Sequence, residues 1–116
     1  MALAKPPVQD NAYAAALALL DRAPLIDGHN DLPYVIRLSR EAKGDVGAYD
    51  LTKIHAEGDT DIPRMQAGKL AGQFFAAYVP PKHPKPAGFA LAQIALMRDI
   101  LRRHADAFRP GLSADD

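Results

Sequence analysis

The chain of 116 residues is long enough for one domain, and its 48% apolar and 24% charged side chains are typical of a globular protein. Fourteen basic and fourteen acidic side chains cancel, so net charge draws it neither to nucleic acid nor to an anionic membrane. The absence of cysteine excludes disulfides, thiolate metal sites and thiol nucleophiles. No secretory signal begins the sequence and no stretch reaches the roughly 20 apolar residues of a membrane span, so we expect a cytoplasmic protein.

The pattern of apolar, capping and breaking residues predicts five elements. An alanine- and leucine-rich helix that begins after Asp10 or Asn11 comes first. A strand, a short helix capped by Asp61, a second strand and a helix with a basic last turn follow. A turn or two of helix over 34–42 and a loop over 43–57 are expected between the first strand and the short helix. The predicted bounds, in chain order, are 12–22, 25–31, 59–68, 73–79 and 90–104.

The second predicted strand has apolar side chains on both faces, which is typical of a parallel sheet covered on both sides. The aromatic rings of 74–78 are therefore expected in the core. The four prolines of 80–86 exclude a helix or a central strand there. Two parallel strands rarely form a sheet alone, and a (β/α)₈ barrel takes roughly 250 residues. The sequence thus predicts an α/β fold in which residues 1–116 are the N-terminal part of one barrel domain.

A histidine and an aspartate stand two residues apart at the polar end of the first predicted strand. Period-two geometry sends His29 and Asp31 to one face, where an imidazole nitrogen and a carboxylate oxygen are able to bind one metal ion. Nitrogen and oxygen ligands favour zinc, manganese or a related divalent ion. The same alternation places Asp27 on that face, as a partner of the imidazole or as a structural cap, and points Asn30 the other way. Gly28 permits close approach of another backbone.

The spacing alone is not specific, because 104–106 repeats it at a helix end, where residues two apart do not face each other. His55 and His83 fall in predicted loops, where surface positions are expected. No nucleophile–base pair emerges, so no catalytic residue is identified. The only glutamates, Glu41 and Glu57, lie outside the predicted strands, and neither is placed to bridge two metal ions.

Three stretches, taken in order, resemble the membrane dipeptidase (renal dipeptidase) family of zinc metallopeptidases, peptidase family M19. They are PLIDGHNDLP at 24–33, TDIPRMQAGKLAGQFFAAYVP at 60–80 and QIALMRDILRRHADAF at 93–108. Their order and spacing over about 85 residues are far more specific than His-x-Asp alone. The resemblance implies a metal-dependent hydrolase barrel, with two zinc ions at the carboxyl ends of its strands, that hydrolyses dipeptides.

By the same resemblance, His29 and Asp31 match the ligand pair of one zinc ion, and Tyr34 stands where relatives often carry an aromatic residue near the substrate. A homo-oligomer of the intact enzyme is left open. In relatives, later strands bring the bridging glutamate and the other histidines, so the 116-residue chain alone is expected to be an inactive fragment. Two alternatives to a dipeptidase fragment remain. One is an inactive remnant or small binding module. The other is a different amidohydrolase-like enzyme, but the resemblance of residues 60–80 to the dipeptidase family disfavours it.

Overall fold

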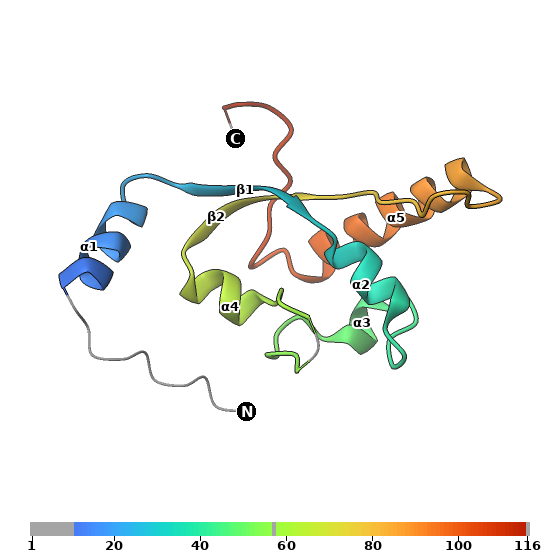
Figure 1. Ribbon diagram of the computed structural model, residues 1–116, viewed down its shortest axis with the longest axis horizontal. Coiled ribbons are helices and arrows are strands. Elements are labelled where there is room, and N and C mark those ends of the chain that lie inside the picture. Colours follow the sequence, from blue (N-terminus) through green and yellow to red (C-terminus); the bar gives the residue numbers. More distant parts are fainter. Residues whose placement is uncertain (1–10, 57, 116) are drawn as a thin grey trace.

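The computed structural model describes residues 11–56 and 58–115, so the predicted cap Asp10 lies outside the described residues. A two-stranded sheet connects α1 at one end to the other helices (Figure 1). The elements that come after β1 in the sequence, one strand and several helices, lie together in one group. The elements are α1 (Asn11–Leu20), β1 (Leu25–Asn30), α2 (Leu32–Leu38), α3 (Val46–Tyr49), α4 (Ile62–Ala67), β2 (Leu70–Phe75) and α5 (Pro86–Arg103).

The strands β1 and β2 pair in parallel, as the order of the predicted elements requires. The second strand begins three residues earlier and ends four residues earlier than the predicted 73–79. The end of β2 is set by β1, the strand with which it pairs. The N–H of Ala76 donates to the carbonyl of Asn30, the last residue of β1, and the chain after β1 turns into α2. An apolar run continues as far as Val79, but no strand in the described part of the chain pairs with it there. The predicted bounds of the second strand were therefore wrong, because its end depends on where β1 ends and not on its own sequence.

The helices follow the local signals more closely. The Asp61 side chain accepts the N–H of Arg64 and caps α4, which ends at Gly68 as predicted. The helix α5 begins at Pro86, four residues before the prediction, because proline is tolerated in a first turn. The loop predicted over 43–57 contains the short helix α3, and so that prediction was wrong in part. No helix among the described residues combines the length and apolarity needed to cross a membrane.

The buried core lies between the helices rather than on the sheet. Helix α2, helix α3 and helix α5 supply most of it, and Phe75 is the residue of β2 that packs against it. Phe74 and Tyr78 remain 66% and 38% exposed, so the prediction that these rings are buried was wrong. Every residue of β1 before Asn30 is exposed as well. The fully or nearly buried apolar residues are Leu32, Ile36, Ala42, Val46, Tyr49, Leu51, Ile62, Leu96 and Ile100.

Helix α1 packs loosely. None of its residues is buried. The Lys69 ammonium donates to the carbonyl of Leu17 in this helix and pairs with the carboxylate of Asp21 just after it. A surface pair of this kind contributes at most about 1 kcal/mol. The helix is thus an outer element, whereas the carboxyl ends of β1 and β2 lie against the buried core, through Leu32 and Phe75.

Candidate metal-binding site at the end of the first strand

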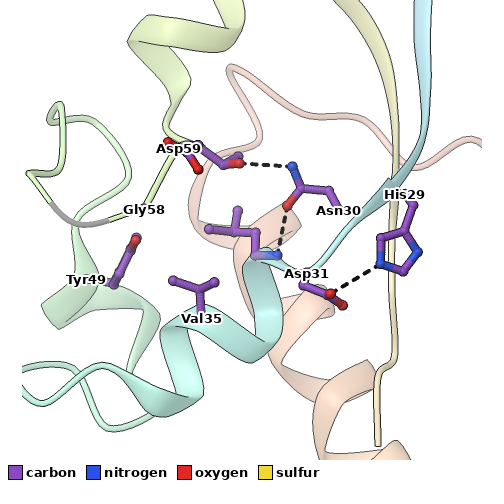
Figure 2. Close-up of a pocket in the computed structure, with 9 residues that line it drawn as sticks. His29, Asn30, Asp31, Val35, Tyr49, Gly58 and Asp59 are labelled. Atoms are coloured by element: carbon purple, nitrogen blue, oxygen red, sulfur yellow. Dashed lines mark hydrogen bonds and ion pairs between the residues drawn. The ribbon is translucent and has the colours of Figure 1, made fainter.

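The structure brings His29 and Asp31 together. The imidazole Nε2 of His29 lies 3.2 Å from the carboxylate Oδ2 of Asp31, and the two side chains are 67% and 42% exposed. Figure 2 shows both side chains on the same side of the first turn of α2. His29 is the penultimate residue of β1, and Asp31 directly precedes α2. The predicted convergence of these two side chains is what the geometry shows.

The second carboxylate oxygen of Asp31 has no hydrogen-bond partner among the described residues. Asp31 Oδ1 is buried and accepts no hydrogen bond from any described residue. Buried carboxylate oxygens are normally hydrogen-bonded, because desolvation is otherwise uncompensated. An oxygen of this kind beside an imidazole nitrogen matches the donors that a divalent cation such as zinc prefers. The described residues contain no group of three or more such side chains, so the pair fits only part of a metal's coordination sphere.

A shift in strand register separates Asp27 from this pair. Asp27 lies opposite Gln73, whereas the next paired position joins Asn30 to Phe75, so β1 has one residue more than β2 between them. Asp27 and Asn30 both contact the Gln73 side chain and so share one face of the sheet. The prediction that Asn30 points to the face opposite Asp27 was therefore wrong.

Asp27 has a structural contact instead. Its carboxylate accepts hydrogen bonds from Gln73 Nε2 at 3.0 Å and from the backbone N–H of His29 at 3.2 Å, and both lower the pKa of Asp27. Within the described residues, no hydrogen bond joins this carboxylate to the His29 imidazole. Close backbone approach at Gly28 is not observed, since an added Cβ would meet no described atom within 4 Å. Asp27 thus contacts the predicted ligand pair through the backbone N–H of His29.

Asn30, between the two predicted ligands, makes more hydrogen bonds than either. Its Oδ1 accepts the N–H of Leu32 at 2.8 Å, and its Nδ2 donates to Thr60 Oγ1 at 2.9 Å and more weakly to Gln73 Oε1 at 3.4 Å. An asparagine before a helix, able to accept an N–H of its first turn, is a local signal that the sequence contains. Its contacts with Thr60 and Gln73 depend on the fold, which sequence patterns do not give.

A pocket of about 300 Å³ adjoins the pair (Figure 2). Its walls come from the end of β1, the first turns of α2 and the segment 58–60, and Tyr49 closes one side. Figure 2 shows Val35, Tyr49 and Asp59 on the opposite side of the α2 turn from His29. The residues around it are His29, Asn30, Asp31, Leu32, Val35, Tyr49, Gly58, Asp59 and Thr60.

The structure places Tyr34 outside this pocket. Its ring packs edge-on against Tyr78 at a centroid distance of 4.9 Å and lies 6.4 Å from the ring of Phe89. The rings belong to α2, to the segment after β2 and to α5, so they join the site's helix to its surroundings. Contact of Tyr34 with a substrate stays a prediction.

The other histidines have structural roles. His55 is only partly exposed: its ring stacks on Tyr49 at 4.0 Å, and its Nε2 lies 3.1 Å from the carbonyl oxygen of Asp50. His83 packs beside Phe89, and its Nδ1 accepts the N–H of Lys85. Both histidines lie outside helices and strands and are partly exposed, so neither is buried.

His104 ends α5, where its backbone N–H closes the last turn. No ion pair joins its side chain to Asp106 in the structure as described, which matches the expectation for that copy of the spacing. Neither residue takes part in the candidate site.

Asp61 fixes the segment that forms the far wall of the pocket. The side chain is fully buried, which alone would raise the pKa of the carboxyl. Backbone N–H groups of Arg64 and His55 and the Arg64 guanidinium all donate to it, and the net effect is a pKa below the ordinary value. The guanidinium also donates to the carbonyl of Gly58. Asp61 therefore joins α4, the segment around His55 and the pocket wall.

We expect stability to depend on the charge of Asp61 in acid. Because its pKa is lower in the folded chain, its contribution is complete above the ordinary pKa of 3.8 and disappears as pH falls below that value. Urea unfolding at pH 6, 5, 4 and 3 is expected to show a smaller loss of stability with acid in Asp61→Asn than in the wild type. Asp59→Asn is the control and should follow the wild type; equal slopes for all three proteins would contradict the assignment.

A strand–helix–strand unit with parallel strands and its site at the carboxyl end of a strand is the general arrangement of α/β enzymes. The sequence model of the membrane dipeptidase family (peptidase family M19) matches residues 13–116. The chain belongs to this family, and the predicted resemblance is confirmed.

Relatives that are named dipeptidases agree with this assignment. Dipeptidase ataJ of Aspergillus terreus is 38% identical over 126 aligned residues, covering 94% of this chain and 28% of that protein. Dipeptidase 3 of Rattus norvegicus is 36% identical over 96 residues, covering 80% of this chain and 18% of that protein, and Dipeptidase 3 of Mus musculus matches equally. The chain therefore spans less than a third of the length of these relatives. At the level of the family, the activity is that of a dipeptidase.

Proposed function

We propose that this chain forms the first strand–helix–strand part of a zinc-dependent dipeptidase barrel, and that His29 and Asp31 bind one of its two zinc ions. The observation that carries the proposal is the pairing of His29 Nε2 with Asp31 Oδ2 at the end of β1, while Asp31 Oδ1 is buried without a partner. Family membership and relatives named as dipeptidases support hydrolysis of dipeptides as the reaction.

The roles within the chain follow from its chemistry. His29 would contribute an imidazole nitrogen and Asp31 a carboxylate oxygen, and a bound ion would supply Lewis-acid activation of the peptide carbonyl. A catalytic zinc site has three protein ligands, and the described residues offer two in one place. The other ligands of a working site therefore come from segments that contribute further strands. The exposed residues of β1 and the exposed Phe74 of β2 support this, since a barrel covers its strands on both sides.

The proposal is tested on the 116-residue chain by titration with ZnCl₂, with the imidazole nitrogens followed by NMR. The His29 nitrogens are expected to shift first, and the binding is expected to be weak. His29→Ala and Asp31→Asn should abolish that response. His104→Ala is the matched control, because His104 and Asp106 have the same spacing without the geometry, and it should leave the response unchanged.

The same preparation is expected to hydrolyse no dipeptide with or without added zinc, because two ligands do not complete the site. Zinc binding that persists in both His29→Ala and Asp31→Asn would refute the assignment of the ligands. Hydrolysis that a chelator does not suppress would refute the metal's role altogether.

A further inference from the structure

We propose that Asn30 and Gln73 are positioning residues that orient the His29–Asp31 pair through its backbone. The proposal rests on the proposed function, because it concerns the geometry of the same two ligands. It begins from an observation about their side chains: within the described residues, the hydrogen-bonding contact of the His29 imidazole is with Asp31, and that of the Asp31 carboxylate is with His29. Neither side chain is held by a separate carboxylate or carbonyl, the partners that usually orient metal ligands.

The orientation must then come from the main chain to which the pair is attached. Asn30 lies between the two ligands, and its Oδ1 accepts the N–H of Leu32 at 2.8 Å. That bond fixes the turn from β1 into α2, and the turn contains Asp31. The amide group of Asn30 then reaches across to Thr60 Oγ1 at 2.9 Å, which anchors the turn to the segment before α4. One side chain thus fixes the backbone of Asp31 from two sides.

Gln73 does the same for His29 from the neighbouring strand. Its Nε2 donates to the Asp27 carboxylate at 3.0 Å and lies 3.3 Å from the Asp27 carbonyl oxygen. The same carboxylate accepts the N–H of His29 at 3.2 Å. Gln73 Oε1 accepts from Asn30 Nδ2 at 3.4 Å, so the two backbone contacts are connected by one glutamine.

Because of the register shift in β1, these hydrogen bonds affect the direction in which the His29 side chain points. With the extra residue of β1 between Asp27 and Asn30, strict alternation no longer decides where His29 points. The side-chain hydrogen bonds on either side of the shift select one backbone conformation. Their loss is expected to let the shifted segment take other conformations, in which His29 and Asp31 no longer converge on one ion. Outer residues that orient ligands typically change metal affinity by about 10- to 100-fold.

The experiment uses the 116-residue chain and two measurements. Without metal, three-bond couplings about the Cα–Cβ bond of His29 report whether its ring holds one rotamer. With ZnCl₂, the shift of the His29 nitrogens gives the dissociation constant. The variants are Gln73→Met, which keeps the length of the side chain, and Thr60→Val, which keeps its shape. Gln66→Met on the exposed face of α4 is the matched control. Melting temperatures are recorded for all of them.

We expect one His29 rotamer in the wild type and in Gln66→Met, and rotamer averaging with about tenfold weaker zinc binding in Gln73→Met. Thr60→Val should show a smaller change in the same direction. Melting temperatures should not account for the difference. An averaged His29 ring in the wild type, or unchanged couplings in both variants, would overturn the proposal. So would a loss of zinc affinity that simply follows melting temperature across all variants, the control included.

The two proposals fail separately. If the wild type holds one rotamer, and Gln73→Met and Thr60→Val release it, Asn30 and Gln73 are positioning residues even when no zinc shift is seen at His29. In that case the assignment of the metal ligands fails alone. If zinc binds at His29 with equal affinity and an equal rotamer in every variant, the metal site stands and the positioning role is wrong.

Discussion

Replacing Asp61 by alanine is expected to lower the free energy of unfolding by about 3 kcal/mol, through loss of a helix cap and of hydrogen bonds to a fully buried carboxylate. The cap of α4 contributes about 1 kcal/mol of this. The remainder comes from the N–H of His55 and the Arg64 guanidinium, which lose their common acceptor in a region of low solvent access. Urea unfolding monitored by far-ultraviolet circular dichroism measures the change.

Asp59→Ala is the control for this prediction. Asp59 lies two positions before Asp61, is exposed, and lines the pocket beside the candidate site. Its substitution is expected to change the free energy of unfolding by less than about 0.5 kcal/mol. Equal effects of Asp59→Ala and Asp61→Ala would show that the buried hydrogen bonds contribute nothing beyond ordinary surface polarity. A loss near 1 kcal/mol for Asp61→Ala would reduce its role to the cap alone.

Local signals were enough to predict the helices around the site. An aspartate, a proline two residues on and a glycine at the other end predicted α4, because capping and φ restriction act within a few residues of the chain. The pairing of His29 with Asp31 was predicted in the same way, from two positions on one short segment. Such contacts need no knowledge of what packs against them.

The contacts of Asp27 and Asn30 were not predictable in this way. Both depend on Gln73, more than forty residues later, and on a register shift that the pairing of two strands creates. Period-two alternation assumes an unbroken ladder, and one added residue reverses every face beyond it. The sequence does contain an asparagine in the position that favours a turn into a helix. That signal indicates a turn, but not the direction of the neighbouring side chains.

The burial of side chains on β2 was not predictable from the strand's own sequence, because it depends on which other elements cover each face. Phe74 and Phe75 are adjacent, equally aromatic and equally apolar in pattern, yet Phe75 packs on the helical core whereas Phe74 is 66% exposed. The difference lies in what covers each face of β2, and the described helices cover one. The apolar pattern of β2 predicts that both of its faces are covered, as is typical of a strand in a larger parallel sheet.

The helical core and the site share α2. Ile36 is fully buried in that helix, and Asp31 directly precedes its first turn. Ile36→Ala is expected to lower the free energy of unfolding by about 3 kcal/mol, since removal of a buried side chain loses transfer energy and leaves a cavity. Because α2 then packs less tightly, the single rotamer expected for His29 should also begin to average. Urea unfolding and the His29 couplings measure the two effects.

Val35→Ala provides the comparison from the same turn of α2, because Val35 is 39% exposed and lies outside the buried core. Its substitution is expected to change stability by less than about 1 kcal/mol and to leave the His29 couplings as they are. A loss for Ile36→Ala no larger than that of Val35→Ala would mean that α2 is not held by the helical core. If Ile36→Ala has the expected loss of stability but His29 keeps one rotamer, the hydrogen bonds of Asn30 and Gln73 hold the pair independently of how tightly α2 packs.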